Sequence, residues 1–249
     1  MSENRTRIVI VGGVACGPKA AARARRCDSK AEIILIERGR YLSYAGCGLP
    51  YFIGGAVPEM DGLMTTPYGI VRDEEFFLSF KDIAVRTGTL AESIDRTKQT
   101  LRVRDLESGR REEIPYDRLV LATGARPASL PVPGADLGRV FSLHVPGDAL
   151  QIRKLIEDGE VDHAVLIGGG RVSLEAAEAL FAHAVDSTVV EIENRLLPGA
   201  LDPEMSALVE NELRENDVEI LTSEKVIRLE GNDDGIVCRV VTDRRTVET

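Results

Sequence analysis

The sequence has few of the side chains from which disulfide frameworks and zinc sites are built. Its 249 residues include only four cysteines and three histidines, and no two cysteines form a CxxC pair. The cysteines are Cys16, Cys27, Cys47 and Cys238. This spacing argues against a disulfide-rich secreted fold and a structural zinc site, so we expect no bound metal and free thiols in a reducing compartment.

Long apolar runs and an excess of positive charge are also missing. No run approaches the roughly 20 apolar residues that a membrane-spanning helix needs, so we expect a soluble protein in the cytoplasm. The 31 basic and 41 acidic residues give a net charge of −10, which argues against nucleic acid and anionic membranes as main partners. With 43% hydrophobic residues, the chain can form one large domain or two ordinary ones.

The first strong pattern is a strand, a glycine turn and a helix near the start of the chain. A β-branched run at residues 8–11 meets a turn from Gly12 to Gly17, and an alanine-rich helical segment follows. The next predicted strand ends at Glu37, twenty-five positions beyond Gly12. Such a unit binds a dinucleotide: the pyrophosphate lies on the helix N-terminus and the carboxylate accepts from a ribose hydroxyl. Val14 replaces the second glycine of the strict motif.

The same pattern occurs a second time. A strand at residues 164–167 leads into Gly168 and Gly170, and the small residue Ser173 stands at the third glycine position. Glu191 closes this unit twenty-three positions after Gly168. Two such units in one chain predict an α/β protein with two Rossmann-like folds that binds two nucleotides.

The segment between the two units carries further strands and a stiff connection. Strand-like runs at 83–86, 99–103 and 119–124 precede a stretch with three prolines that ends at residue 134. We therefore expect a first domain at residues 1–125, a linker at 126–146, and a second domain at 147–249.

Four motifs together resemble one enzyme family. They are VGGVACG at 11–17, SYAGCGLPYFIGG at 43–55, LVLATGARP at 119–127 and IGGGRVSLEAAE at 167–178. The sequence resembles the flavin-dependent pyridine nucleotide-disulfide oxidoreductases, in the branch with one redox cysteine that holds coenzyme A disulfide reductases, NADH oxidases and NADH peroxidases. The resemblance implies an FAD unit with an inserted NAD(P)H unit, each with a parallel sheet and a small antiparallel β-meander. Complete family members are expected to be homodimers and to continue well beyond Thr249.

The resemblance also assigns the two cofactor sites. The positions implied for FAD are Gly12, Gly13, Val14, Gly17, Glu37, Arg38, Val85, Ala122, Thr123, Gly124 and Arg126. The positions implied for the nicotinamide nucleotide are Gly168, Gly170, Ser173, Glu175 and Glu191. A carboxylate at the end of the second strand repels a 2′-phosphate, so NADH is expected rather than NADPH, although Arg195 leaves NADPH open.

Cys47 is the expected redox centre. In relatives with a cysteine pair, four residues separate the two sulfurs, but the nearest cysteine in this sequence is Cys27. Cys47 would then act alone, through a mixed disulfide with a small thiol or through a sulfenic acid. Ser43 resembles the family's active-site serine. The alternatives are a buried, inert thiol for Cys47 and a simple turn cap for Ser43.

The same comparison suggests the substrate. Lys19, Arg23 and Arg26 share one face of the first predicted helix, where they could bind the phosphates of coenzyme A, although a solvated basic face is the plain alternative. The resemblance adds Lys81, Ser43 and Gly46 to this substrate set. Peroxidases and water-forming oxidases of the family carry a histidine in the first glycine turn, where this sequence has Ala15. An alanine cannot act as a general acid there, which favours disulfide reduction over peroxide or oxygen chemistry.

These observations predict a flavin-dependent NAD(P)H:disulfide oxidoreductase. Its expected substrate is coenzyme A disulfide or a related persulfide or polysulfide. Two alternatives remain open at the level of the sequence. One is an NADH oxidase that reduces oxygen, and the other is a catalytically incomplete nucleotide-binding module.

Overall fold

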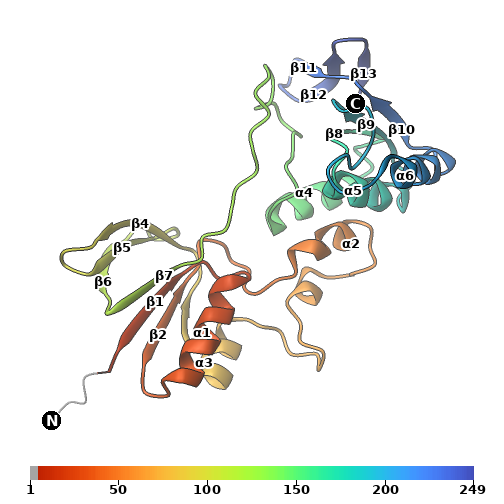
Figure 1. Cartoon of the computed structure of the whole chain (residues 1–249). Helices are drawn as coiled ribbons and strands as arrows, with labels where there is room; N and C mark the ends of the chain where they lie inside the picture. Colours follow the sequence, from red (N-terminus) through yellow and green to blue (C-terminus); the bar gives the residue numbers. More distant parts are fainter. Residues whose placement is uncertain (1–4) are drawn as a thin grey trace. The chain divides into compact units, whose positions relative to one another are not determined.

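The structure is a computed structural model that describes residues 5–249 (Figure 1). The chain folds into two compact units. The first unit holds Met1–Ala45 and Glu59–Arg126, and the second holds Gly46–Pro58 and Pro127–Thr249. The short segment with Cys47 therefore packs with the second unit, although both of its flanks in the sequence belong to the first.

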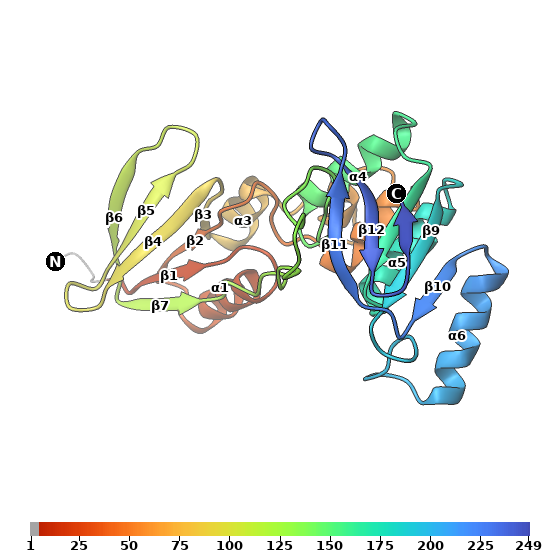
Figure 2. The ribbon, with the colours of Figure 1, turned by 90° about the horizontal axis from the view of Figure 1, so that it is seen from above.

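The first unit is a parallel sheet with helices on one face and a β-meander on the other (Figure 2). The sheet has the order β3-β2-β1-β7, with β1 at Arg7–Val11, β2 at Glu32–Ile36, β3 at Ala84–Arg86 and β7 at Arg118–Leu121. The helices are α1 at Cys16–Cys27 and α3 at Glu74–Lys81, and the 3-10 turn η2 spans Met60–Leu63. The meander consists of β4 at Thr89–Asp95, β5 at Thr100–Asp105 and β6 at Arg111–Pro115.

Both faces of this sheet are buried, which explains its continuous apolar strands. Ile10 of β1 packs toward α1, where it meets the cluster that contains Ala21. Its neighbours Val9 and Val11 pack with Leu101 and the other apolar residues of the meander. A strand that is covered on both sides is apolar along its buried length, so β1 and β2 do not alternate between polar and apolar residues after their first positions, Arg7 and Glu32.

The second unit repeats this architecture. Its parallel sheet has the order β10-β9-β8, with β8 at His163–Ile167, β9 at Asp186–Glu191 and β10 at Glu219–Thr222. The helices are α4 at Pro146–Glu157, α5 at Arg171–Phe181 and α6 at Pro203–Glu215. The meander consists of β11 at Val226–Gly231, β12 at Val237–Thr242 and β13 at Thr246–Glu248. Val189 of β9 packs in a cluster with Ala177 of α5, whereas the next residue, Val190, packs with Val240 of the meander. The prediction of two Rossmann-like units with parallel sheets and antiparallel meanders is confirmed.

The segment Gly46–Pro58 adds two short helical elements to the second unit. These are the 3-10 turn η1 at Gly46–Gly48 and the helix α2 at Leu49–Ile53. In Figure 1, the orange α2 lies beside α4 and α5.

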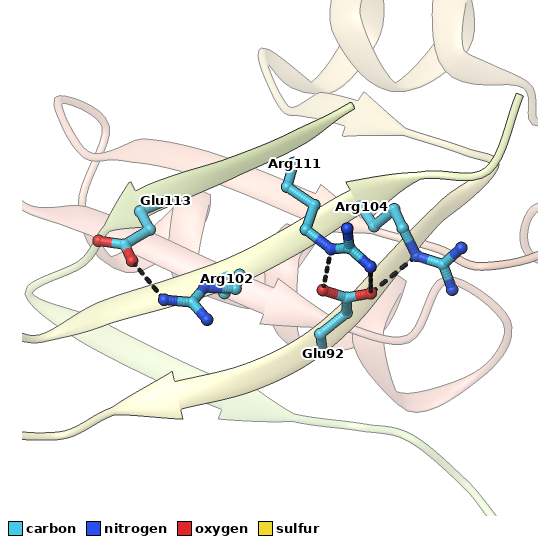
Figure 3. Close-up of polar contacts among 5 residues, drawn as sticks. All are labelled: Glu92, Arg102, Arg104, Arg111 and Glu113. Atoms are coloured by element: carbon cyan, nitrogen blue, oxygen red, sulfur yellow. Dashed lines mark hydrogen bonds and ion pairs between the residues drawn. The ribbon is translucent and has the colours of Figure 1, made fainter. Parts of the chain in front are cut away.

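Ion pairs connect the strands of the first meander (Figure 3). Glu92 on β4 accepts a hydrogen bond of 2.7 Å from Nε of Arg104 and one of 2.9 Å from Nε of Arg111. Arg102 on β5 donates to Glu113, which lies directly opposite on β6, at 3.0 Å. The hydrogen bond from Arg111 is the main cause that lowers the pKa of Glu92, and Arg104 adds to it.

This lowered pKa makes the first meander sensitive to acid. A carboxylate with a depressed pKa in the folded state stabilises the fold above its unfolded pKa, and this stability is lost as the pH falls through the folded pKa. We expect Glu92→Gln to lower the melting temperature at pH 7, and we expect this difference from the parent to shrink and vanish as the pH falls through the lowered pKa of Glu92. Circular dichroism melts across this range measure the effect. Glu107→Gln, which removes an exposed carboxylate on the β5–β6 turn, is the matched control. If the melting temperature of Glu92→Gln stays below that of the parent by the same amount at all pH values, the stabilising role of the Glu92 carboxylate is contradicted.

Candidate functional site

The first glycine turn leaves no room for side chains at two positions. Gly12 has φ +111°, and a Cβ there would lie 2.1 Å from the carbonyl oxygen of Ala122. A Cβ on Gly17 would lie 1.7 Å from the carbonyl oxygen of Gly12. These contacts involve backbone atoms that cannot move away, so both positions require glycine. Val14, by contrast, is half-buried and is accommodated at the second position of the motif.

A carboxylate ties this turn to the end of β2. Glu37 Oε2 accepts from the Gly13 N–H at 2.5 Å, and Oε1 accepts from the Gly39 N–H at 2.6 Å. Each carboxylate oxygen has two positions that can accept a hydrogen bond, and Glu37 uses one position on each of its two oxygens here. The remaining positions can accept from ribose hydroxyls, which is the role predicted for Glu37.

The second turn is built in the same way from different residues. Gly168 has φ +98° and donates to the Val190 carbonyl at 2.7 Å, as Gly12 donates to Ile36 at 2.8 Å in the first unit. Glu191 is only 8% exposed. Its Oε2 accepts from the Gly169 N–H at 2.5 Å, and its Oε1 accepts from the Glu193 N–H at 2.8 Å.

Gly169 is a site residue that the sequence analysis missed. A Cβ there would lie 2.5 Å from a methyl group of Leu196 and 3.1 Å from Glu191 Oε2. The sequence did contain a feature that indicates Gly169, because Gly13 occupies the equivalent position in the first turn. The strict G-x-G motif directs attention to Gly168 and Gly170 and passes over the glycine between them.

Both turns fit a dinucleotide. They lie at the carboxyl ends of parallel strands and open helices of 12 and 11 residues. Among the described residues, no side chain caps the N-terminus of α1 or α5, so the first N–H groups of each helix can bind a pyrophosphate. The first turn and Glu37 form a site that fits FAD. The second turn and Glu191 form a site that fits a nicotinamide nucleotide.

Most of the other residues predicted for FAD follow the carboxyl ends of strands in the first sheet. Ala122, Thr123 and Gly124 follow β7, and the Ala122 N–H donates to the Val11 carbonyl at 2.8 Å. Arg38 follows Glu37 and is exposed, and Val85 lies on β3 opposite Leu35 of β2. Arg126 is exposed at the end of the unit. In the second unit, Ser173 and Glu175 are half-buried on α5.

The predicted cationic stripe is exposed on α1. Lys19, Arg23 and Arg26 have no acidic partner among the described residues. Arg25, on another face of the same helix, instead forms an ion pair of 3.1 Å with Asp82. The stripe is therefore a solvated, uncompensated set of positive charges that is free to meet an anion.

Two further predicted residues lie in the first unit. Ser43 has φ 49°, and its N–H donates to the Gly13 carbonyl at 2.8 Å, so it helps to fix the glycine turn through its backbone. Lys81 ends α3, and its Nζ lies 5.7 Å from the centre of the Phe76 ring.

Cys47 is exposed in η1, between Gly46 and Gly48. It is not a buried thiol in an apolar environment. All four cysteines lie within the described residues and are free thiols. Leu49, Phe52 and Ile53 of the following helix α2 are buried, so a fixed element presents an accessible sulfur.

Residues 5–249 show neither a metal-binding cluster nor a membrane-spanning helix. That part of the chain holds no group of three or more histidine, cysteine, aspartate or glutamate side chains able to bind a metal ion. None of its helices is long and apolar enough to cross a bilayer.

Two glycine turns, each closed by a buried or half-buried carboxylate, define a protein that binds two dinucleotides, and an accessible cysteine accompanies them. Residues 6–249 match the family described as pyridine nucleotide-disulphide oxidoreductase, and the chain belongs to that family.

The curated relatives of the chain include enzymes named for sulfur or disulfide reduction and an NADH oxidase of Methanocaldococcus jannaschii, to which it is 31% identical over 91% of this chain and 49% of the relative. It is 34% identical to the NAD(P)H sulfur oxidoreductase (CoA-dependent) of Pyrococcus abyssi, over 95% of this chain and 50% of the relative. It is 33% identical to the coenzyme A disulfide reductase of Staphylococcus haemolyticus, over 89% of this chain and 48% of the relative. A solved NAD-dependent persulfide reductase from A. fulgidus superposes with a TM-score of 0.92 at 42% identity, over 98% of this chain and 44% of that one. The chain thus spans about half the length of the curated relatives it matches.

Proposed function

We propose that the chain forms the nucleotide-binding and thiol-bearing part of an FAD-dependent NAD(P)H:disulfide oxidoreductase. Its substrate is coenzyme A disulfide or a related persulfide or polysulfide. The observation that carries this proposal is an accessible, unpaired Cys47 in a chain with two built dinucleotide sites. Three relatives whose names refer to sulfur, coenzyme A disulfide or persulfide as the substrate support the same substrate class.

The chemistry follows from the residues in place. The Cys47 thiolate attacks one sulfur of a disulfide R–S–S–R, forms Cys47–S–S–R, and releases one thiolate, which takes a proton from water. Two electrons and a proton from NADH then cleave the mixed disulfide into the Cys47 thiolate and a second thiol, leaving NAD⁺. Bound FAD supplies the two-electron carrier between nicotinamide and sulfur.

Other parts of the chain bind and orient the reactants. Glu191 accepts from the ribose of the nicotinamide nucleotide and disfavours a 2′-phosphate, so NADH is the proposed reductant. Lys19, Arg23 and Arg26 bind the phosphates of the coenzyme A moiety, with Lys81, Ser43 and Gly46 in the same substrate set. The unpaired thiols favour the cytoplasm, and the resemblance to the family favours a homodimer for the whole protein.

The stripe on α1 gives a test of the substrate class. We expect Arg23→Ala combined with Arg26→Ala to raise the KM for coenzyme A disulfide about tenfold or more, because charge-assisted contacts to phosphate are lost. The KM for NADH should stay the same. Steady-state assays with each substrate varied in turn measure the difference.

A matched control removes the same charge elsewhere. Arg96→Ala combined with Arg244→Ala takes away two exposed arginines that have no side-chain partner among the described residues. This pair should leave both KM values unchanged. An equal rise in both KM values for the α1 variant would contradict the assignment of coenzyme A to this stripe.

A further inference from the structure

Two side chains that come much later in the sequence contact α2, the short helix that follows Cys47. Arg153 on α4 donates from Nη1 to the Pro58 carbonyl at 2.8 Å and to the Phe52 carbonyl at 3.2 Å. Its guanidinium also lies over the Phe52 ring, 4.6 Å from the ring centre. An ion pair of 2.7 Å between Arg153 Nε and Glu157 Oε1 fixes the direction of the guanidinium.

His183, which follows α5, supplies a second contact. Its Nε2 lies 2.8 Å from the carbonyl oxygen of Ile53, the last residue of α2. A carbonyl can only accept, so Nε2 carries the proton and donates. The last carbonyls of a helix have no partner within it. At this end of α2, His183 donates to the Ile53 carbonyl. Arg153 adds a second donor to the Phe52 carbonyl, which also accepts from the Gly55 N–H at 3.2 Å.

The backbone of α2 also approaches α5 closely. A Cβ on Gly54 would lie 3.2 Å from Cα of Ala179, which is a backbone atom of α5. A helix of five residues is too short to be stable on its own. The position of α2 therefore depends on this set of contacts, which we call the α2 clasp: Arg153, His183 and Gly54.

We propose that Arg153 and His183 are positioning residues for Cys47. They fix the C-terminal end of α2, and Cys47 lies just before the N-terminal end of the same short helix, so the clasp sets where the sulfur is held. The unit that carries the NAD(P)H site thereby determines the position of the thiol. This inference rests on the proposed redox role of Cys47.

Hydrogen–deuterium exchange tests the clasp without an assay of activity. In Arg153→Ala, we expect the amides of residues 49–57 to exchange about tenfold faster or more, because hydrogen bonds from a charged donor are lost. Arg153→Lys should restore protection only in part, since lysine cannot reach several acceptors with a planar fork. His183→Leu should accelerate the same amides, and His183→Gln, which keeps an N–H donor, should accelerate them less.

The matched control is Arg214→Ala. Arg214 on α6 pairs with Glu210 four residues away at 3.1 Å, as Arg153 pairs with Glu157. Among the described residues, its side chain forms no hydrogen bond or ion pair with the Cys47 segment. Exchange in residues 49–57 should stay as in the parent. Equal exchange rates in Arg153→Ala and the parent would overturn the clasp.

Kinetics separate positioning from mere stabilisation. In Arg153→Ala, we expect kcat for disulfide reduction to fall about tenfold, while NADH-dependent reduction of ferricyanide, an acceptor that needs no thiol, stays unchanged. Faster exchange with unchanged disulfide turnover would overturn the positioning role. Disulfide turnover retained in Cys47→Ser would instead refute the proposed function, and with it the positioning role, while the exchange data would still report on the clasp as a structural contact.

Discussion

Cys47→Ser is expected to lose disulfide reduction by about a thousandfold or more. A serine hydroxyl is a poor nucleophile toward sulfur at neutral pH, and it cannot form the mixed disulfide through which one thiol is released. The replacement is nearly isosteric and lies at an exposed position, so the fold and both nucleotide sites should persist. The measurement is thiol released per NADH oxidised under anaerobic conditions, with two thiols expected for each NADH in the parent.

Two other cysteines provide the controls. Cys16 and Cys27 are also exposed free thiols, at the two ends of α1, and serine at either position should leave disulfide turnover within about twofold of the parent. Turnover that survives in Cys47→Ser would remove the central claim. NADH oxidation that requires oxygen and releases no thiol in the parent would favour the oxidase alternative.

Glu191→Gln is expected to raise the KM for NADH about 10- to 100-fold. The buried carboxylate accepts from Gly169 and Glu193, and an amide can accept through only one of its two terminal atoms. One backbone N–H therefore loses its acceptor, at a cost of about 1–3 kcal/mol, and one ribose hydroxyl loses its partner as well. The rise in KM for NADPH should be smaller, because the charge that repels a 2′-phosphate is gone. Initial rates with each nucleotide measure the change in preference.

The equivalent change in the first unit gives a crossed control. Glu37→Gln alters the same pair of backbone contacts, to Gly13 and Gly39, and should weaken retention of FAD without changing the KM for NADH. Glu178→Gln, on the exposed side of α5, should change neither. An unchanged KM for NADH in Glu191→Gln, or an effect on FAD instead, would contradict the assignment of the two sites.

The sequence predicted the features that depend on local geometry. Gly12 and Gly17 are required by contacts within one strand–turn–helix unit, and such units have a characteristic spacing. Glu37 and Glu191 were predicted for the same reason, because each stands at the end of the strand next to its own glycine turn. Both carboxylates accept from that turn, and their contact with a ribose stays a prediction. Gly169 was missed only because the motif places weight on its neighbours.

The surroundings of Cys47 could not be predicted in this way. Arg153 reaches the Phe52 carbonyl across 101 positions, and His183 reaches Ile53 across 130. No periodicity or spacing in the sequence marks contacts of this length. The role of the Ser43 backbone, at φ 49° against the first glycine turn, also depends on a conformation that a serine rarely adopts.

The placement of Gly46–Pro58 has a consequence for recombination between relatives. A chimera joined at Pro127 would take its nucleotide-binding second half from one parent and its thiol segment from the other. The carbonyls of Phe52 and Ile53 would then come from one parent, and the side chains at positions 153 and 183 that donate to them would come from the other. Exchange of reductant preference by swapping whole modules should therefore succeed only when residues 46–58 travel with residues 127–249.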